Sequence, residues 1–221
     1  MIEAVIFDMD GVIVDSESLW EKALKKYLIE KNKTLPPSRE FKTLVNNHFR
    51  GRSQKHIVGF LKKKFSLKDS HQKIFHERIK TIINIFDEDL EDIPGAFALI
   101  RLLHRNNYPL LLASSSPKKV INYVVRKYEL RQYFKHFISG DDFGKGKPNP
   151  EIFLKGAKLL KAKPENILVI EDSISGIRAA VRAGMKCIVL KHPYNSYASL
   201  QSTNLIVKSL KEITLQTIKK L

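Results

Sequence analysis

Short apolar runs recur along the chain, each ending in polar or small residues. The runs that we predict as strands are 4–7, 110–113, 137–138, 167–170 and 187–190. Stretches with apolar residues at helical spacing lie between several of them, at 96–104, 118–128, 150–160 and 174–183. Strands that alternate with helices are typical of a parallel sheet with helices on both faces. The pattern therefore predicts an α/β fold.

Residues 17–86 follow a different pattern. This stretch has few β-branched runs and many Lys, Glu, Leu and Ile residues at helical spacing, which predicts an α-helical insertion. The insertion leaves the core after the first strand and returns through the acidic segment 87–92. We therefore expect two units, a core formed by residues 1–16 and 87–221 and a helical domain formed by residues 17–86.

The length and composition are those of a globular protein. A chain of 221 residues, 43% of them hydrophobic, can fill a core domain and a smaller insertion. The N-terminus lacks the features of a secretory signal, and no apolar run approaches the ~20 residues that span a bilayer. We expect a cytoplasmic protein without a membrane partner. Cys187 is the only cysteine and lies in an apolar run, so we expect an inert core thiol.

The chain is strongly basic, with 39 Lys and Arg against 23 Asp and Glu and a formal net charge of +16. Clustered positive charge would favour a nucleic acid or a membrane surface as partner. Here the basic residues are spread from Lys22 to Lys220, and no nucleic-acid-binding module is recognisable. We therefore expect a solvated lysine-rich surface on a monomer that binds no nucleic acid. The basic field would still attract a small phosphorylated substrate.

Chemically active residue types follow the predicted strands where each strand ends. In open parallel sheets, ligands bind beyond the carboxyl ends of the strands. The sequence Asp-Met-Asp-Gly-Val follows the first strand at 8–12, three serines follow the second at 114–116, and Glu-Asp-Ser follows another at 171–173. A loop between the strands at 110–113 and 167–170 offers Lys147. We expect these groups to meet at one edge of the sheet.

Asp8 and Asp10 are two positions apart, so in extended geometry both carboxylates face the same site. Two adjacent carboxylates need a cation, and Mg²⁺ prefers oxygen ligands, commonly one or two carboxylates together with substrate phosphate. Asp172, with Glu171 beside it, would add a carboxylate from a neighbouring strand end. Seen alone, the two aspartates are also typical of a solvated turn, and Asp172 with Ser173 of a helix cap. The motifs together favour a magnesium site.

An aspartate can be the nucleophile of phosphoryl transfer, because an acyl phosphate divides one displacement into two easier ones. We predict this role for Asp8. Lys147 would supply fixed positive charge, Ser114 a hydrogen bond, and the backbone N–H groups of residues 9–11 an anion nest. Asp10 would protonate the leaving alkoxide and later deprotonate the attacking water. Taken singly, Ser114 is also typical of a helix N-cap and Lys147 of an exposed loop.

Four segments of the chain resemble, in order, the four motifs of the haloacid dehalogenase superfamily. They are residues 8–17 (DMDGVIVDSE), the strand that ends at Ser114, residues 146–153 (GKPNPEIF) and residues 169–180 (VIEDSISGIRAA). The resemblance spans nearly the whole chain. It implies a Rossmann-like core, an α-helical cap inserted after the first motif, and dependence on Mg²⁺.

The resemblance also implies roles by position. Asp8 would be nucleophile and metal ligand, and Asp10 would be acid/base and metal ligand through its carbonyl. The other implied roles are phosphate binding by Ser114, Ser115 and Lys147, and metal binding by Asp172 with Glu171 in support. An aspartate at position 10 is typical of phosphatases and phosphomutases, since the dehalogenase branch lacks this acid/base.

The first part of the cap bears on the branch of the family. The stretch from Asp8 to Trp20 resembles sugar-phosphate phosphatases and also β-phosphoglucomutase. The mutase branch usually has a histidine where this chain has Trp20, and an arginine where this chain has Gln54. The segment with Arg50, Gly51 and Arg52 resembles the substrate-facing loop of the family, and its arginines would grip a second anionic or hydroxyl-rich part of the ligand. A solvated basic turn is an equal alternative for this segment.

These features predict a phosphatase that acts on a small phosphorylated metabolite, a sugar or polyol phosphate, under a cap that excludes bulk water. Trp20 would then be a substrate-binding residue. The alternative is a sugar phosphomutase of the β-phosphoglucomutase type, in which a sugar hydroxyl rather than water receives the phosphoryl group from Asp8. A third hypothesis, a binding protein that retains the site as a scaffold, is disfavoured because no motif residue is missing.

Overall fold

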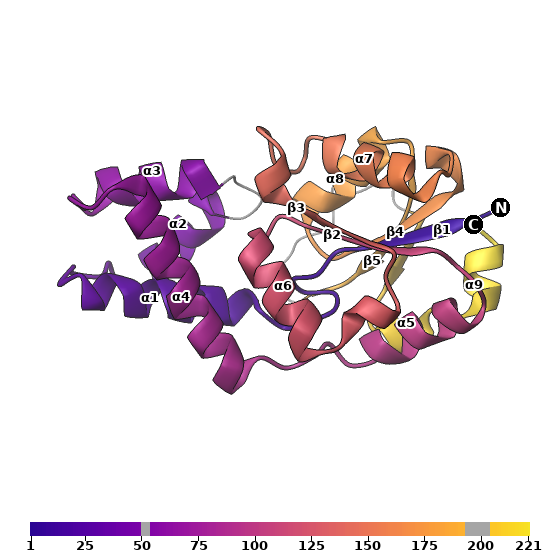
Figure 1. Cartoon of the computed structure of the whole chain (residues 1–221), viewed down its shortest axis with the longest axis horizontal. Coiled ribbons are helices and arrows are strands. Elements are labelled where there is room, and N and C mark those ends of the chain that lie inside the picture. The colour runs from indigo at the N-terminus through magenta and orange to yellow at the C-terminus, as the bar shows by residue number, and fades with distance from the viewer. Residues whose placement is uncertain (50–53, 193–203) are drawn as a thin grey trace.

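The computed structural model describes residues 1–49, 54–192 and 204–221 and has two lobes (Figure 1). Helices α1 to α4 form one lobe, which we call the cap, and the sheet with the other helices forms the core. Both termini lie at the end of the core that is remote from the cap. No helix in the described ranges is both long enough and apolar enough to cross a membrane.

A parallel sheet lies at the centre of the core. Among the described residues its strand order is β3-β2-β1-β4-β5-β6, and every neighbouring pair is parallel. The strands are β1 Ala4–Phe7, β2 Leu110–Ser114, β3 His136–Ser139, β4 Ile167–Glu171, β5 Lys186–Leu190 and β6 Leu205–Val207. Strands β1 to β5 contain the predicted apolar runs, so the predicted α/β fold is confirmed. Strand β6 was not predicted.

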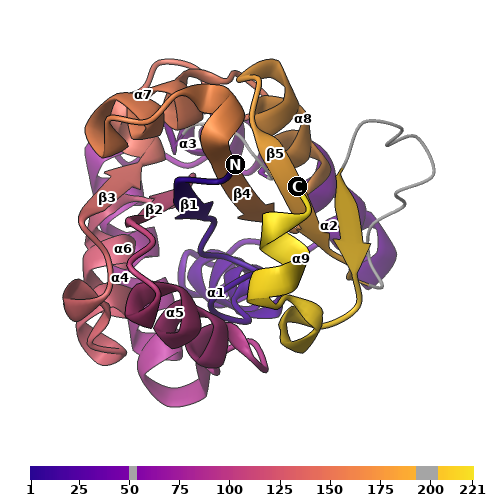
Figure 2. The same cartoon turned by 90° about the vertical axis from the view of Figure 1, so that its right-hand side faces the viewer.

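Helices cover both faces of the sheet, with α5, α6 and α9 on one face and α7 and α8 on the other (Figure 2). Side chains alternate along a strand, so Val5 and Phe7 pack with the first group of helices, whereas Ala4 and Ile6 pack with the second. The helices are α5 Ala96–Arg105, α6 Lys118–Lys127, α7 Glu151–Leu160, α8 Ile174–Arg182 and α9 Leu215–Lys219. Short 3-10 helices are η1 Leu130–Gln132, η2 Gly140–Asp142, η3 Pro164–Asn166 and η4 Leu210–Glu212.

The cap has a hydrophobic core of its own. Its helices are α1 Glu17–Glu30, α2 Ser38–His48, α3 Gln54–Lys64 and α4 His71–Asp89. They bury apolar residues at helical spacing, among them Leu24, Leu28, Phe41, Leu61 and Ile74. Helix α4 continues to Asp89, so the first three residues of the predicted acidic linker form its last turn. Ile85 and Phe86 are buried there, and Tyr123 of the core donates a hydrogen bond to Asp87 at 2.7 Å.

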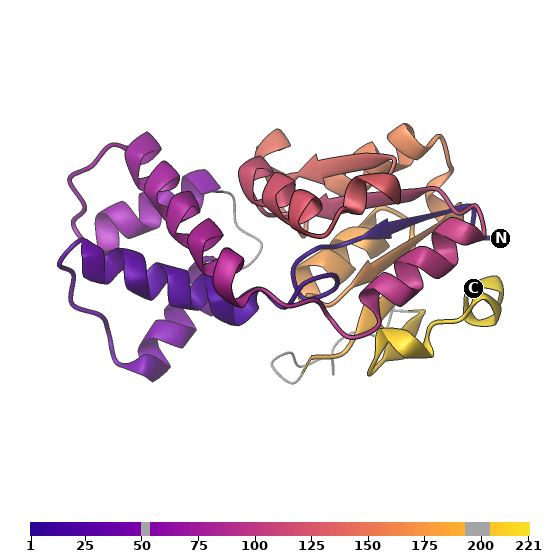
Figure 3. The ribbon, with the colours of Figure 1, turned by 60° about the horizontal axis from the view of Figure 1, so that its bottom comes forward.

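Two segments cross between the lobes and lie side by side (Figure 3). The outgoing segment ends at Ser16, and the returning segment follows α4. They pair through backbone hydrogen bonds from Asp15 N–H to the carbonyl of Glu91 at 3.0 Å and from Ile93 N–H to the carbonyl of Ile13 at 2.9 Å. This pairing holds the cap over the edge of the sheet at which β1 ends.

Candidate active site

Strands β1, β2 and β4 end side by side, because they are parallel neighbours. The chain order reverses between β1 and β4, and ligands of such sheets bind at this switch point. A cavity of about 280 Å³ lies there between the sheet edge and the cap. The core residues that line it include Asp8, Asp10, Ser115, Ser116, Lys147 and Asp172, and the cap residues include Trp20, Glu21, Gln54 and Arg78.

Lys147 lies among buried carboxylates. Its Nζ is 2.7 Å from Asp8 Oδ1 and 2.6 Å from Glu171 Oε1, and it donates to the carbonyl of Ala113 at 3.3 Å. The loop before α7 brings Lys147 to this position, and its side chain is only 3% exposed. The structure therefore excludes the alternative of an exposed loop lysine, and it places fixed positive charge directly beside Asp8.

The buried charges shift one another's protonation. Burial raises the pKa of Asp8 above its ordinary value, and the positive charge of Lys147 opposes the increase. Burial also raises the pKa of Asp172, and the negative charge of Glu171 adds to the effect. Burial lowers the pKa of Lys147, but the charges of Asp8 and Glu171 outweigh it and raise this pKa overall. One lysine thus leaves the carboxylates in need of further positive charge.

Oxygen atoms of Asp8, Glu171 and Asp172 all lie within 4.8 Å of one another, and all three residues are buried. A buried cluster of carboxylate oxygens with excess negative charge fits Mg²⁺, which prefers such ligands. Both oxygens of Glu171 are engaged, because Oε1 pairs with Lys147 and Oε2 accepts the N–H groups of Asp172 and Ser173 at 2.9 Å. The family resemblance implies that Asp8 and Asp172 would hold the ion, with Glu171 in support, and the oxygens of the three residues lie close enough together for this role.

Asp10 accepts four hydrogen bonds. Its Oδ1 accepts from Ser16 Oγ at 2.5 Å and from Trp20 Nε1 at 3.1 Å. Its Oδ2 accepts from Ser114 Oγ at 3.0 Å and from Ser116 Oγ at 2.7 Å. The donors come from both lobes, since Trp20 belongs to α1 of the cap. With both side-chain oxygens engaged, the route to a metal that remains for Asp10 is its main-chain carbonyl, as the family resemblance implies.

The serines after β2 differ in their orientation. Ser114 is fully buried, donates to Asp10 and accepts the N–H of Ser116 at 2.9 Å. Ser115 and Ser116 line the cavity, whereas Ser114 lies behind its wall. The hydroxyl of Ser114 is thus directed to the acid/base candidate. The predicted anion nest is wrong at Gly11, whose N–H donates to the carbonyl of Val14 at 2.8 Å.

The structure brings most of the predicted site residues together. Asp8, Asp10, Ser115, Lys147, Asp172 and Trp20 line one cavity, with Ser114 and Glu171 directly behind them. The predictions for Arg50, Gly51 and Arg52 lie outside the described residues.

Sequence reasoning missed several polar residues of the site, among them Ser16, Ser116, Glu21 and Arg78. Ser16 is fully buried against Asp10, although it lies in the first motif. Ser116 had been named only as part of the strand end. Arg78 enters the cavity from α4 of the cap, and the sequence of that helix gives no signal for it.

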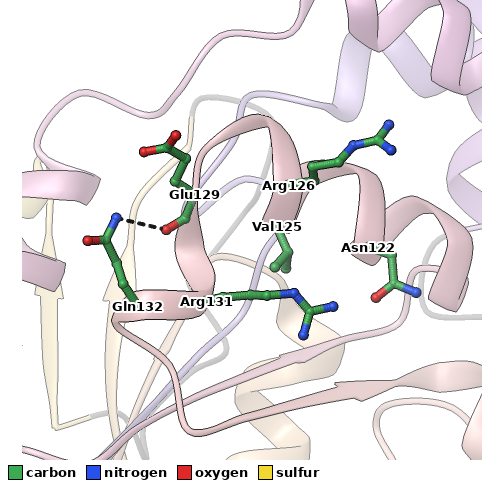
Figure 4. Close-up of a pocket in the computed structure, with 6 residues that line it drawn as sticks. All are labelled: Asn122, Val125, Arg126, Glu129, Arg131 and Gln132. Atoms are coloured by element: carbon green, nitrogen blue, oxygen red, sulfur yellow. Dashed lines mark hydrogen bonds between the residues drawn. The ribbon is translucent and has the colours of Figure 1, made fainter.

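A second hollow, of about 690 Å³, lies on the surface along α6 and η1 (Figure 4). Arg126 and Arg131 line it, together with the exposed residues Asn122, Glu129 and Gln132. Apart from the hydrogen bond from Gln132 Nε2 to the carbonyl of Glu129 at 3.1 Å, Figure 4 shows these polar side chains separated from one another. The motif residues lie elsewhere, so we place the chemistry in the cavity under the cap.

Comparisons with known proteins identify the family of the chain. The family of haloacid dehalogenase-like hydrolases matches residues 2–184. A phosphorylated carbohydrates phosphatase of Thermotoga maritima is 32% identical over 85% of this chain and 84% of its own. The 6-phosphogluconate phosphatase of Escherichia coli is 29% identical over 84% and 80%. The crystal structure of β-phosphoglucomutase from Clostridium difficile has a TM-score of 0.80 and 29% identity, and covers 100% of this chain and 96% of that one.

The family match contains the whole cap and every motif residue discussed above, because it runs from residue 2 to residue 184. It confirms the predicted resemblance, and with the two phosphatases it confirms the prediction of a hydrolase of the phosphatase type. The chain belongs to the family of haloacid dehalogenase-like hydrolases.

Proposed function

We propose that this hydrolase is a Mg²⁺-dependent phosphatase of a small phosphorylated metabolite, a sugar or polyol phosphate, with Asp8 as nucleophile. One observation carries the proposal: the carboxylate of Asp8 lines a capped cavity while Lys147 holds it at 2.7 Å. This arrangement supports the proposal, because a phosphoryl group bound in the cavity would meet a carboxylate that can attack phosphorus and a fixed positive charge for its oxygens.

In the first step an oxygen of Asp8 attacks phosphorus, and the bond from phosphorus to the ester oxygen breaks. A protonated Asp10 gives its proton to the leaving alkoxide, so that an alcohol departs. In the second step water attacks the aspartyl phosphate while Asp10 takes its proton. Inorganic phosphate leaves and the carboxylate of Asp8 is restored. Bound Mg²⁺ would supply positive charge that aligns the phosphate oxygens and neutralises them.

The size of the cavity supports a small substrate. A volume of about 280 Å³ suits a phosphorylated sugar or polyol, and residues of the cap line the cavity together with residues at the strand ends. The relative from Thermotoga maritima, named for phosphorylated carbohydrates, supports the same class.

Water is the proposed acceptor of the phosphoryl group. Trp20 stands where mutases of this family usually have a histidine, and its Nε1 donates to Asp10. The mutase remains the second candidate, since a β-phosphoglucomutase shares the fold over the whole chain at 29% identity. The two functions differ in whether phosphate is released or an isomer is formed.

The test measures phosphate release from a panel of sugar and polyol phosphates, with Mg²⁺ and with EDTA. We expect release that requires Mg²⁺ and falls by about 10⁴-fold or more in Asp8→Asn. Asp89→Asn, which removes a carboxylate from the cap surface, is the matched control and should keep the wild-type rate. Isomerised product without phosphate release would instead establish the mutase, and full turnover by Asp8→Asn would exclude the covalent mechanism.

A further inference from the structure

Arg78 is a buried cation that the steps above do not use. It lies on α4 of the cap, its residue is 6% exposed, and it lines the same cavity as Asp8. Arginine is almost never buried without a partner, because removing its charge from water is costly. The partners of Arg78 therefore indicate what its guanidinium does.

The contacts of Arg78 are with neutral groups. Nη1 donates to Gln54 Oε1 at 3.3 Å, and the guanidinium lies over the ring of Phe49 with 5.9 Å from Cζ to the ring centroid. Within residues 1–49, 54–192 and 204–221, no carboxylate forms an ion pair with it. Lys147, the buried cation at the core end of the cavity, differs because it contacts two carboxylates.

The surroundings of Arg78 disfavour its charge in the absence of a ligand. Burial lowers the pKa of Arg78 to about 10, and the nearby Tyr27 only partly opposes this. A guanidinium has five N–H donors in a planar fork that matches a carboxylate or a phosphate. Gln54 takes one of them and fixes the group without neutralising it. An oxyanion in the cavity would supply the missing charge and acceptors.

The cavity is thus lined by one buried cation from each lobe. Lys147 accompanies Asp8 at the strand ends, and Arg78 approaches from the cap. With the transferred phosphoryl group beside Asp8, the far end of a small substrate would lie under α4. Glu21 also lines the cavity and could accept hydrogen bonds from substrate hydroxyl groups.

We propose that Arg78 binds a second oxyanion of the substrate, a carboxylate or a second phosphate at the end remote from the transferred phosphoryl group. The inference rests on the proposed function and narrows its substrate class to phosphorylated sugar acids or sugar bisphosphates. Arg78 is a specificity-determining residue in this account and takes no part in bond breaking.

The test compares substrates with one carbon skeleton and different far ends: glucitol 6-phosphate, 6-phosphogluconate and glucitol 1,6-bisphosphate. We expect wild-type kcat/KM to be about 10- to 100-fold higher for an anionic far end than for glucitol 6-phosphate. The second and third substrates show which oxyanion, carboxylate or phosphate, Arg78 prefers. Arg78→Met should abolish the preference by raising KM for the anionic substrates, with kcat/KM for glucitol 6-phosphate within about twofold of wild type.

Two variants serve as controls. Arg78→Lys keeps the charge without the planar fork and should keep part of the preference. Arg39→Met removes an exposed arginine from α2 of the cap and should keep the whole preference.

The melting temperature gives an independent readout. Because none of the described carboxylates pairs with the buried charge of Arg78, Arg78→Met should melt at the wild-type temperature or above, whereas a structural role would lower the melting temperature.

Equal kcat/KM for neutral and anionic far ends in the wild type would overturn the inference, as would an equal loss for all substrates in Arg78→Met. Binding to the Asp8→Asn protein with Mg²⁺, measured by calorimetry, separates this failure from that of the proposed function. Tighter binding of 6-phosphogluconate that depends on Arg78, without phosphate release by the wild type, would support the anion site and contradict the phosphatase. Phosphate release without any such preference would contradict the anion site alone.

Discussion

At the scale of single residues, Lys147 determines the charge of the site. It contacts Asp8 and Glu171, and their side chains are at most 9% exposed. Asp172 belongs to the same cluster. Removing the cation from a buried ion pair leaves carboxylates that neither water nor protein neutralises. Lys147 therefore holds Asp8, the proposed nucleophile, in place and also makes it possible to bury the carboxylates at all.

Lys147→Met should lower the free energy of unfolding by about 3–5 kcal/mol in EDTA at pH 8. Mg²⁺ should restore part of this loss, because it supplies positive charge to the same carboxylates. The loss should also shrink at pH 5. Lys147 opposes the rise that burial causes in the pKa of Asp8 and of Asp172. Without the lysine both pKa values are higher, so the folded variant still holds these protons at a pH where the wild type has begun to release them.

Denaturant unfolding at pH 5 and pH 8, with and without Mg²⁺, measures these differences. Lys118→Met, which removes a surface lysine paired with Asp142, is the control and should unfold like the wild type. A loss that is the same at both pH values would contradict this account of Lys147.

Trp20 links the cap to the acid/base candidate. Its Nε1 is one of four donors to Asp10, and its ring packs edge-on against Phe86 with the centroids 5.9 Å apart. Trp20→Phe keeps a ring at this position and removes the donor. We expect kcat to fall by about tenfold with little change in KM, because Asp10 loses a hydrogen bond that orients its carboxylate.

Steady-state kinetics on the best substrate of the panel tests this prediction. Tyr128→Phe removes a hydrogen bond to the carbonyl of Leu90 away from the cavity, and its kcat should match the wild type. A rise in KM at unchanged kcat would show that Trp20 binds substrate and does not orient Asp10.

The site residues that could be predicted from the sequence are those that follow strand ends and belong to the four motifs. Asp8 and Asp172 could be predicted because parallel neighbouring strands must deliver them to one edge. The orientation of the Ser114 side chain could not be predicted, since the sequence does not decide whether its hydroxyl donates to Asp10 or faces the cavity. Arg78 could not either, because only the packing of α4 decides which of its many polar residues faces the core.

At the scale of elements, the first turn of α8 positions the carboxylates after β4. Ser173 caps the helix by accepting the N–H of Gly176 at 3.0 Å, and its own N–H donates to Glu171. A Cβ on Gly176 would overlap the carboxylate of Glu171. The close approach of β4 and α8 therefore requires a glycine at position 176.

Gly176→Ala should displace Glu171 and, through it, the hydrogen-bonded Asp172. We expect a loss of about 1–3 kcal/mol in stability from overpacking and a weaker affinity for Mg²⁺. Thermal unfolding at increasing Mg²⁺ concentration measures both quantities. Gly144→Ala is the matched control, because a Cβ at Gly144 has no atom within 4 Å. Wild-type Mg²⁺ affinity in Gly176→Ala would contradict the positioning role.

The strands that are most completely buried were the easiest to predict from the sequence. Strands β1, β2 and β4 are buried at every residue, so their apolar runs are unbroken and were found. Strand β6 is short, and of its three residues only Val207 is buried, so its pattern is weak. The last turn of α4 was assigned to the linker because Asp87, Glu88 and Asp89 are acidic, yet buried Phe86 and the bond from Tyr123 to Asp87 continue the helix.

At the scale of the whole molecule, the net charge of +16 stands beside a site rich in carboxylates. The sequence spreads its lysines and arginines over the chain, and the described ion pairs use only part of them. An excess of positive charge attracts a phosphorylated substrate over several ångströms. Salt screens this attraction beyond the Debye length, which is about 8–10 Å at an ionic strength of about 0.1–0.15 M. The basic surface would thus raise the local concentration of substrate at the cavity.

We predict that kcat/KM falls by at least about twofold as NaCl rises from about 20 to 200 mM, whereas kcat at saturating substrate stays constant. The constant kcat is the internal control, because an effect of salt on the chemistry or on Mg²⁺ binding would change it too.

The same salt series with labelled duplex and single-stranded DNA tests whether the positive charge binds nucleic acid instead. Because the basic residues form no recognisable binding module, we expect no saturable binding at about 150 mM salt. Tight DNA binding with a steep salt dependence, together with a kcat/KM that ignores salt, would show that the charge serves a polyanion and not the substrate.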